Sequence, residues 1–361
     1  MLELTLSKKK FFDLSKTEEE RALDLHQKAI IIDAMTCINP RLMPPDRRWF
    51  TTMKNSGVTA SSVTSTEQAG LSPARDFRST VELIFKWYDL LEKSGESVVN
   101  RFATRTEDIQ AAKKAKTHIL MLNFQHPDPI EHDVHLLSVL HELGTRVMQL
   151  TYNEKNRIGD GCTERTDCGL SHFGLQVIQE MNRLGMLIDL SHCGHMTTME
   201  AIEHSKDPVA FTHVGMRPLC DNVRNKTDEE LMALAEKDGL VGIVSWSPLA
   251  QTKKGVRPTV EDYLSHVEYA VKLIGVDHVG IGLDLSYGEI TTEEEWEQFR
   301  HKYPNVCGPF AAHNRESEGL ETISGLINIT RGLVAGGYSD QEINKILGDN
   351  FLRLFKRVWR S

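Results

Sequence analysis

Eight short apolar segments recur along the chain, and each is separated from the next by a stretch with helical patterning. They are AIIID (29–33), GVTASSVTS (57–65), HILMLNF (118–124), RVMQLTY (146–152), GMLIDLS (185–191), PVAFTHV (208–214), GLVGIVSW (239–246) and HVGIGLDL (278–285). Their apolar residues run almost continuously, which is typical of parallel strands covered on both faces. Eight strand–helix cycles predict one α/β domain over residues 1–361, folded as a (β/α)8 TIM barrel.

Helix-capping patterns support this interpretation of the segments between the strands. Ser171 precedes apolar residues at spacings of three and four, and Gly185 follows them, so we predict a helix between the two. Thr227 and Glu230 have the capping-box spacing of a helix N-terminus. A doubly wound sheet is the alternative fold, but eight strands without a GxGxxG fingerprint favour the barrel.

The composition argues against several classes of protein. The 361 residues include 51 Asp and Glu against 42 Lys and Arg, a formal net charge of −9 that disfavours nucleic acid and anionic membranes as partners. No stretch approaches the roughly 20 apolar residues that span a bilayer, and the N-terminal segment turns acidic where a signal peptide would stay apolar. Six cysteines are few for this length. We therefore expect a cytoplasmic protein with free thiols.

Three segments after predicted strands are too long to be tight connections: 34–56, 66–78 and 286–316. Connections that follow the strands of a barrel lie at its catalytic face. Long ones usually build or cover a binding site. We expect these three to do so.

Polar side chains end several of the predicted strands. His192 and His213 end two strands that are neighbours in order, and neutral imidazole binds divalent metals and transfers protons. Asp284 ends the last strand and suits a general base or metal ligand; its alternative role is a helix cap. Arg224 can hold a substrate carboxylate, or form a surface ion pair instead. Either histidine alone would more often be structural.

Several long motifs resemble the membrane (renal-type) dipeptidase family of the amidohydrolase superfamily. The resemblance spans roughly residues 25–359, and its motifs are CTERTDCGLSHFGLQVIQEMNRLGMLIDLSH (162–192), FTHVGMRPLCDNVRN (211–225), GIGLD (280–284) and ILGDNFLRLFKRVW (346–359). It implies a barrel of the metal-dependent hydrolase type with two zinc ions, dipeptide hydrolysis and, in many members, a homodimer. By resemblance, His192 and His213 match the histidines of one zinc. Asp284 matches the catalytic aspartate, and Arg224 the arginine that holds the substrate carboxylate.

The sequence departs from the family pattern at the remaining ligand positions. Where the family carries His-x-Asp after the first strand, this chain has Met35 and Cys37. Gln125 stands in place of a glutamate that bridges the two metals, and Tyr152 in place of a substrate-contacting histidine. Two adjacent zinc ions repel each other unless carboxylates offset their charge. We therefore expect at most one zinc ion.

Any such ion would bind at His192 and His213, and Asn123, Gln125 and Tyr152 are further candidates for substrate contact. Three functions stay open because the fold does not choose among them. The first is a dipeptidase-like hydrolase acting on a dipeptide or small amino-acid derivative with a free carboxylate. The second is a metal-independent lyase, decarboxylase or lactam or amide hydrolase. The third is an inactive ligand-binding homologue.

Overall fold

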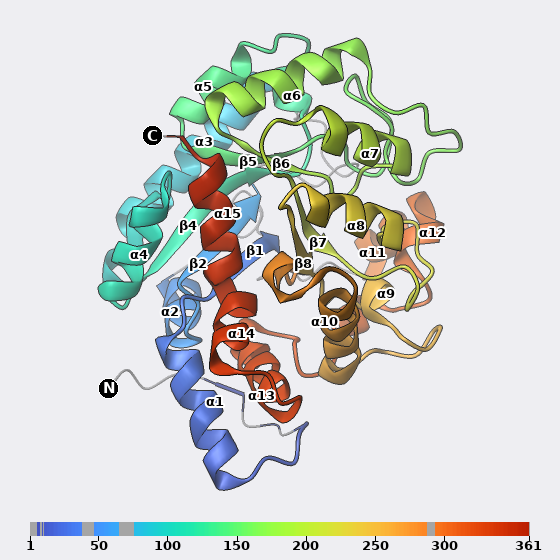
Figure 1. Ribbon diagram of the computed structural model, residues 1–361. Coiled ribbons are helices and arrows are strands. Elements are labelled where there is room, and N and C mark those ends of the chain that lie inside the picture. The colour runs from blue at the N-terminus through green and yellow to red at the C-terminus, as the bar shows by residue number, and fades with distance from the viewer. Residues whose placement is uncertain are drawn as a thin grey trace.

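The computed structural model describes residues 6–7, 9, 11–37, 47–64, 76–286 and 293–360. Eight parallel strands close into a barrel in the order β1–β2–β4–β5–β6–β7–β8–β9, and β9 pairs with β1 again (Figure 1). The strands are β1 (Ile32–Cys37), β2 (Ala60–Thr64), β4 (His118–Phe124), β5 (Thr145–Gln149), β6 (Leu187–Asp189), β7 (Ala210–Val214), β8 (Leu240–Ile243) and β9 (Val279–Ile281). Each overlaps one of the eight predicted segments, so the (β/α)8 prediction is confirmed.

Two further strands were not predicted. β3 (Val98–Phe102) pairs with β4 outside the barrel, and β10 (Leu285–Ser286) pairs with the end of β1. The three middle residues of β3 are partly or fully exposed, so this strand lacks the continuous apolar run that marks the others. β10 is only two residues long and has no pattern of its own.

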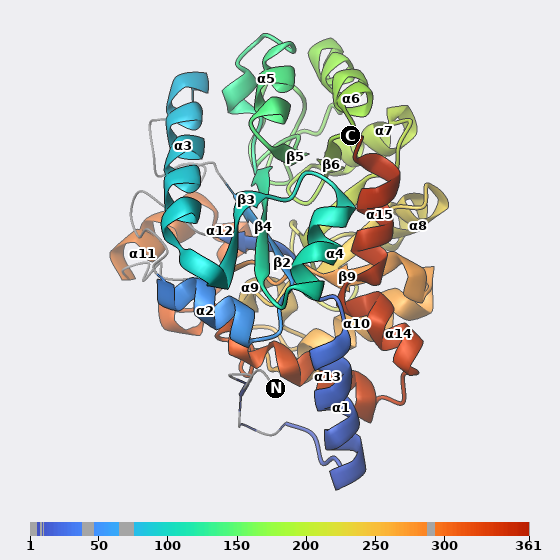
Figure 2. The same ribbon diagram turned by 90° about the vertical axis from the view of Figure 1, so that its left-hand side faces the viewer.

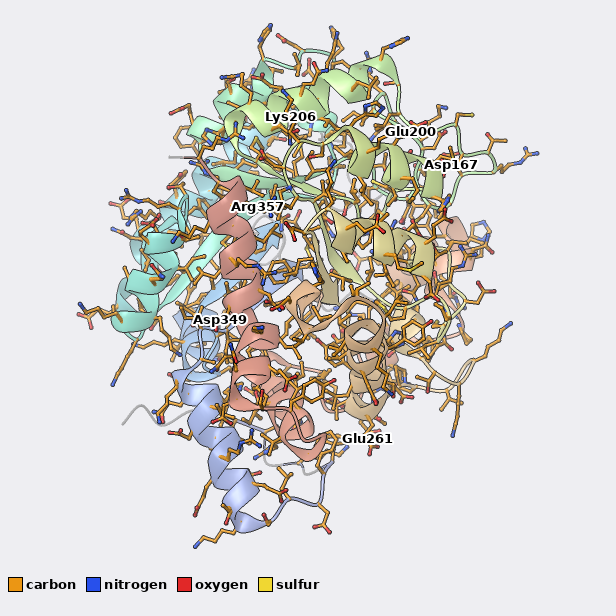
Figure 3. The ribbon with its side chains drawn as sticks, viewed as in Figure 1. Asp167, Glu200, Lys206, Glu261, Asp349 and Arg357 are labelled. Atoms are coloured by element: carbon orange, nitrogen blue, oxygen red, sulfur yellow. The ribbon has the colours of Figure 1, made fainter. Side chains whose placement is uncertain are left out.

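Helices surround the barrel on all sides (Figures 1 and 2). They are α1 (Lys16–Lys28), α2 (Arg47–Asn55), α3 (Phe77–Lys93), α4 (Thr106–Lys114), α5 (Leu136–Glu142), α6 (His172–Leu184), α7 (His195–His204), α8 (Asp228–Glu236), α9 (Ser247–Ala250), α10 (Val260–Ile274), α11 (Glu293–Lys302), α12 (Pro304–Cys307), α13 (Ile327–Ala335), α14 (Asp340–Asn344) and α15 (Asn350–Val358). The predicted caps are confirmed: the Ser171 side chain accepts from the Gly174 N–H, Gly185 is left-handed, and Thr227 forms a capping box with Glu230. Charged side chains such as Lys206, Glu261 and Arg357 are exposed on the outer layer (Figure 3).

The last helix closes one end of the barrel. In Figure 1, α15 passes in front of the strands, and it contacts β1, β8, β9 and α4. Its residues Phe351 and Phe355 belong to the same buried cluster as Ile32, Ile119 and Leu187 from the barrel interior. These three side chains lie near the N-terminal ends of their strands, so the opposite, C-terminal end is left for a functional site.

The long segments predicted after the strands contain helices of their own. Residues 34–56 include the end of β1 and all of α2, and residues 286–316 include α11 and α12. Parts of the three segments, residues 38–46, 65–75 and 287–292, lie outside the described residues. None of the helices in the described part of the chain combines the length and the apolar character needed to cross a bilayer.

Two glycines allow β7 to pack closely against its neighbours inside the barrel. A Cβ atom at Gly282 or at Gly242 would overlap the carbonyl oxygen of Thr212 in β7. We expect Gly282→Ala to lower the free energy of unfolding by about 3 kcal/mol, because backbone must move to relieve the overlap. Urea unfolding measures this. The control Gly336→Ala, whose Cβ would come no nearer than 3.3 Å to any neighbour, should change it much less. Equal effects would contradict the packing argument.

Candidate active site

Two histidine side chains meet at the C-terminal ends of neighbouring strands. β6 and β7 are hydrogen-bonded in parallel, so His192, just after β6, and His213, within β7, come from the same end of the barrel. Their Nε2 atoms are 3.0 Å apart, and the side chains are 5% and 0% exposed. The structure therefore brings together the two residues that strand order predicted as neighbours.

The other nitrogen of each ring is held by a hydrogen bond. Nδ1 of His192 lies 2.7 Å from Oδ1 of Asn153, an acceptor, so this nitrogen carries the proton. Nδ1 of His213 lies 2.7 Å from the Thr212 hydroxyl, which itself donates to Asp189 over 2.6 Å. Because that hydroxyl proton is committed to Asp189, its oxygen accepts from His213. Both Nε2 atoms therefore carry lone pairs that face each other.

Burial keeps both rings neutral. Desolvation and the positive charge of Arg224 lower the pKa of His192 and of His213 well below the usual value. Two neutral imidazoles with lone pairs 3.0 Å apart repel each other, and a cation between them removes the repulsion. The two neutral, converging nitrogens can therefore serve as ligands for a metal ion.

Asp284 follows β9 in a left-handed conformation, with φ of 58°, and its N–H donates to the Met35 carbonyl over 3.0 Å. The Cys37 thiol donates to the carboxylate over 3.0 Å. Burial raises the pKa of Asp284 to about 6, although the Cys37 hydrogen bond and the charges of Arg224 and Arg315 oppose the rise. A carboxyl with this pKa exchanges a proton readily near neutral pH. Asp284 caps no described helix, so the capping alternative does not apply.

Arg224 follows β7 and is only 2% exposed, so it is not a surface ion-pair residue. Its Nη1 donates to the Ser191 carbonyl and its Nη2 to the His213 carbonyl at 3.3 Å. Its positive charge lowers the pKa of both histidines and opposes the rise in the pKa of Asp284. A guanidinium has five N–H donors, and these two contacts use two of them. The other donors of Arg224 can bind an anionic group of the substrate.

Tyr152 stacks on the ring of His192, with ring centroids 4.1 Å apart and an interplanar angle of 20°. Burial and nearby groups, among them Cys37, Asp284 and Tyr303, raise the pKa of the Tyr152 hydroxyl well above its usual value, so it stays protonated. Tyr303 directly precedes α12, so the middle of the segment 286–316 lies within electrostatic reach of Tyr152.

Comparison with known proteins identifies the family. Residues 49–308 match the sequence profile of the membrane dipeptidases, peptidase family M19. The chain belongs to the membrane dipeptidase family. A solved structure of an amidohydrolase from Pseudomonas aeruginosa superposes with a TM-score of 0.82 and 31% identity, covering 94% of this chain and 99% of that one.

Two curated relatives are similar to this chain at lower identity. Dipeptidase tcpJ of Claviceps purpurea is 27% identical over 76% of this chain and 59% of its own length. An uncharacterized dipeptidase of Schizosaccharomyces pombe is 29% identical over 72% of this chain and 63% of its own length. The chain thus spans less than two thirds of these two relatives.

The structure shows where the residues that we expect to replace the family's ligands lie in this membrane dipeptidase family member. Met35 points toward Asn123, whose Nδ2 is 3.9 Å from the Met35 sulfur and donates to Ser62 over 2.6 Å. Cys37 points toward Asp284. Gln125 follows β4 directly and is 2% exposed. Its backbone carbonyl accepts a hydrogen bond from the side-chain amide of Gln149. Asn123 is buried, and its Oδ1 has no partner among the described residues.

The histidine pair offers nitrogen ligands that suit a metal ion. His192 and His213 offer two converging imidazole nitrogens, the ligand type that zinc prefers. Among the described ranges, no group of three or more His, Cys, Asp or Glu side chains is arranged to hold a metal ion. A pair of metal ions needs bridging and terminal carboxylates, and Met35, Cys37 and Gln125 provide none.

Sequence reasoning missed the residues that orient the histidines. These residues lie close in the chain to predicted site residues. They are Asn153, directly after Tyr152, Thr212, directly before His213, and Asp189, three residues before His192. Polar residues inside otherwise apolar strands, as in DLSH (189–192) and FTH (211–213), are a pattern that can reveal such partners.

Proposed function

We propose that this membrane dipeptidase family member is a dipeptidase-like hydrolase that acts on a dipeptide or a small amino-acid derivative with a free carboxylate. The observation that carries the proposal is the convergence of the His192 and His213 nitrogens at the end of the barrel where Asp284 follows β9, with the charge of Arg224 acting on all three groups. The names of the relatives support the same class of reaction.

Each residue has a distinct role in this proposal. Arg224 binds the substrate carboxylate with its remaining N–H groups. Asp284 accepts a proton from the water that attacks the amide carbon and passes it to the leaving amine as the C–N bond breaks. His192 and His213 would hold at most one zinc ion, which, when bound, polarises the amide carbonyl and acidifies water. Tyr152 limits the movement of His192 by stacking.

A second candidate is a metal-independent acid–base enzyme acting on a similar substrate. It is favoured by the 3.0 Å separation of the two Nε2 atoms, which is also a hydrogen-bond distance that a single proton can bridge. The inactive homologue has less support, because the histidine pair, the carboxyl with a raised pKa and the buried arginine all occur together.

The test compares a dipeptide with its C-terminal amide. The full chain is assayed on a panel of L,L and L,D dipeptides, and on the amide of the best substrate. We expect hydrolysis of at least one dipeptide, with kcat/KM for the amide lower by about 30-fold or more, because Arg224 loses its charged partner. Failure to cleave any dipeptide, with or without added zinc, would overturn the proposal.

The acid side of the pH profile reports on Asp284. Its pKa is raised to about 6, and the base form is the ionised one, so kcat/KM should rise with pH through about 6 and level off above it. Cys37→Ala removes a hydrogen bond that lowers this pKa, so it should move the acid limb to higher pH. The control Cys220→Ala changes a buried thiol that bonds the Pro248 carbonyl, and it should leave the limb in place. An unshifted limb in Cys37→Ala would contradict this assignment.

A further inference from the structure

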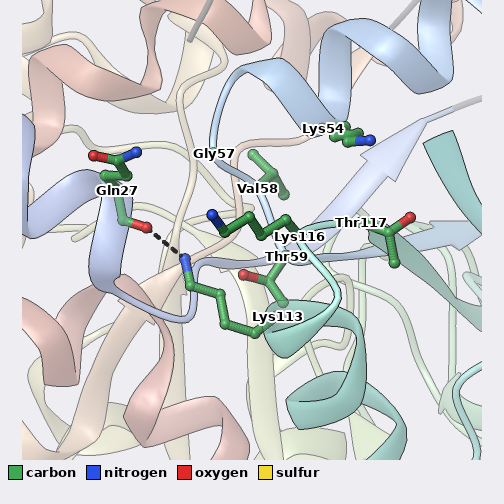
Figure 4. Close-up of a pocket in the computed structure, with 8 residues that line it drawn as sticks. All are labelled: Gln27, Lys54, Gly57, Val58, Thr59, Lys113, Lys116 and Thr117. Atoms are coloured by element: carbon green, nitrogen blue, oxygen red, sulfur yellow. Dashed lines mark hydrogen bonds between the residues drawn. The ribbon is translucent and has the colours of Figure 1, made fainter. Parts of the chain in front are cut away.

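A cavity of about 130 Å³ lies at the end of the barrel opposite the candidate active site (Figure 4). Its walls come from the end of α1, the connection from α2 to β2, and the connection from α4 to β4. Each of these segments leads into the N-terminal end of a barrel strand. At ~30 Å³ for each water molecule, the space equals roughly four waters, enough for a small polar group.

Three lysines line the cavity, and no Asp or Glu is among its described lining residues. In Figure 4 the amino groups of Lys113 and Lys116 lie beside Gln27, whereas the amino group of Lys54, on the other wall, is directed away from them. The Lys113 amino group donates to the Gln27 carbonyl over 2.9 Å. Within the described ranges, none of the three lysines forms an ion pair. Such a cluster is unusual in a chain whose net charge is −9.

Two other features of the cavity lack a partner: the positive charge of Lys113 and the backbone N–H of Val58. Burial lowers the pKa of Lys113 to about 8, with no carboxylate opposing the shift. Val58, another lining residue, is 2% exposed, and its N–H has no acceptor among the described residues. Buried backbone N–H groups nearly always have a partner. A bound anion would offset the charge of the ammonium groups.

We propose that the cavity is a binding site for a phosphate-class oxyanion, either inorganic phosphate or the phosphoryl group of a small phosphomonoester, held by Lys113 and Lys116. Lysine serves as a point-charge partner for phosphate. A doubly charged oxyanion matches two ammonium groups better than a singly charged carboxylate does. The site is separate from the catalytic end of the barrel and does not depend on the reaction proposed above.

Calorimetric titration of the full chain at constant ionic strength tests the proposal, with inorganic phosphate in one arm and glycerol phosphate in the other. We expect saturable binding of one anion per chain in at least one arm. Tighter binding of phosphate would identify the free ion as the ligand, and tighter binding of the ester a phosphorylated metabolite. Absence of saturable binding in both arms would overturn the proposal.

Matched variants locate the site. Lys113→Gln should weaken binding by about tenfold or more, and Lys116→Gln, a change at an exposed side chain that does not threaten folding, by several-fold. Lys114→Gln is the control, because Lys114 is exposed at the end of the same helix and lies outside the cavity. Binding that is unchanged in both test variants, or equally weakened in the control, would place the anion elsewhere.

Discussion

Replacing His213 by alanine is expected to lower kcat/KM for dipeptide hydrolysis by about a thousandfold or more. The change removes one of the two Nε2 lone pairs that face each other at 3.0 Å, so neither a metal ion nor a shared proton can be held there. Acid–base groups alone contribute about 10²–10⁴-fold to rates, and residues that act as a unit lose most of their effect when one is removed. Steady-state kinetics over a range of substrate concentrations measures the loss.

The matched control is His204→Ala, since His204 is exposed at the end of α7. It should retain kcat/KM within about twofold. Circular dichroism of the His213→Ala protein shows whether the barrel is intact. A folded His213→Ala protein with more than a tenth of the original kcat/KM would show that His213 does not take part in the reaction.

The second large effect is expected at Asp284. Asp284→Asn keeps the shape of the side chain but cannot accept a proton, so kcat should fall by about 10²–10⁴-fold while KM changes little. The acid limb of the pH profile near 6 should disappear with it, because the carboxyl with the raised pKa is gone. The residual rate as a function of pH measures both consequences.

Asp277→Asn is the control for this substitution. Asp277 lies just before β9, half exposed, and pairs with Lys345 at the opposite end of the strand from Asp284. We expect it to leave kcat and the pH profile unchanged. A pH limb near 6 that persists in Asp284→Asn would assign that ionisation to another group.

The barrel could be predicted from the sequence because its strands are covered on both faces. A strand such as HILMLNF (118–124) is buried at every position, and this leaves an apolar run that stands out from amphipathic helices. β3 has no such run, because it pairs with β4 on one side only and its middle residues reach solvent. The pattern therefore identified the strands that are covered and missed the one that is not.

The histidine pair could also be predicted, since strand order alone makes β6 and β7 neighbours. What the sequence could not give is the contact between Cys37 and Asp284, which depends on closure of the barrel between β1 and β9 across about 250 residues. The contact between Asn153 and His192 could not be predicted either. The backbone of Asn153 is left-handed, with φ of 57°, and this conformation directs its side chain toward His192. Both contacts follow from tertiary geometry rather than from local pattern.

The metal content of the purified chain tests the account most directly. After equilibration with zinc and removal of loosely bound ions, elemental analysis should give one zinc ion or fewer per chain. Any bound ion should be lost in His192→Ala and in His213→Ala, because these two rings supply the converging nitrogens. Two zinc ions per chain, or one ion that persists when both histidines are replaced, would contradict the account.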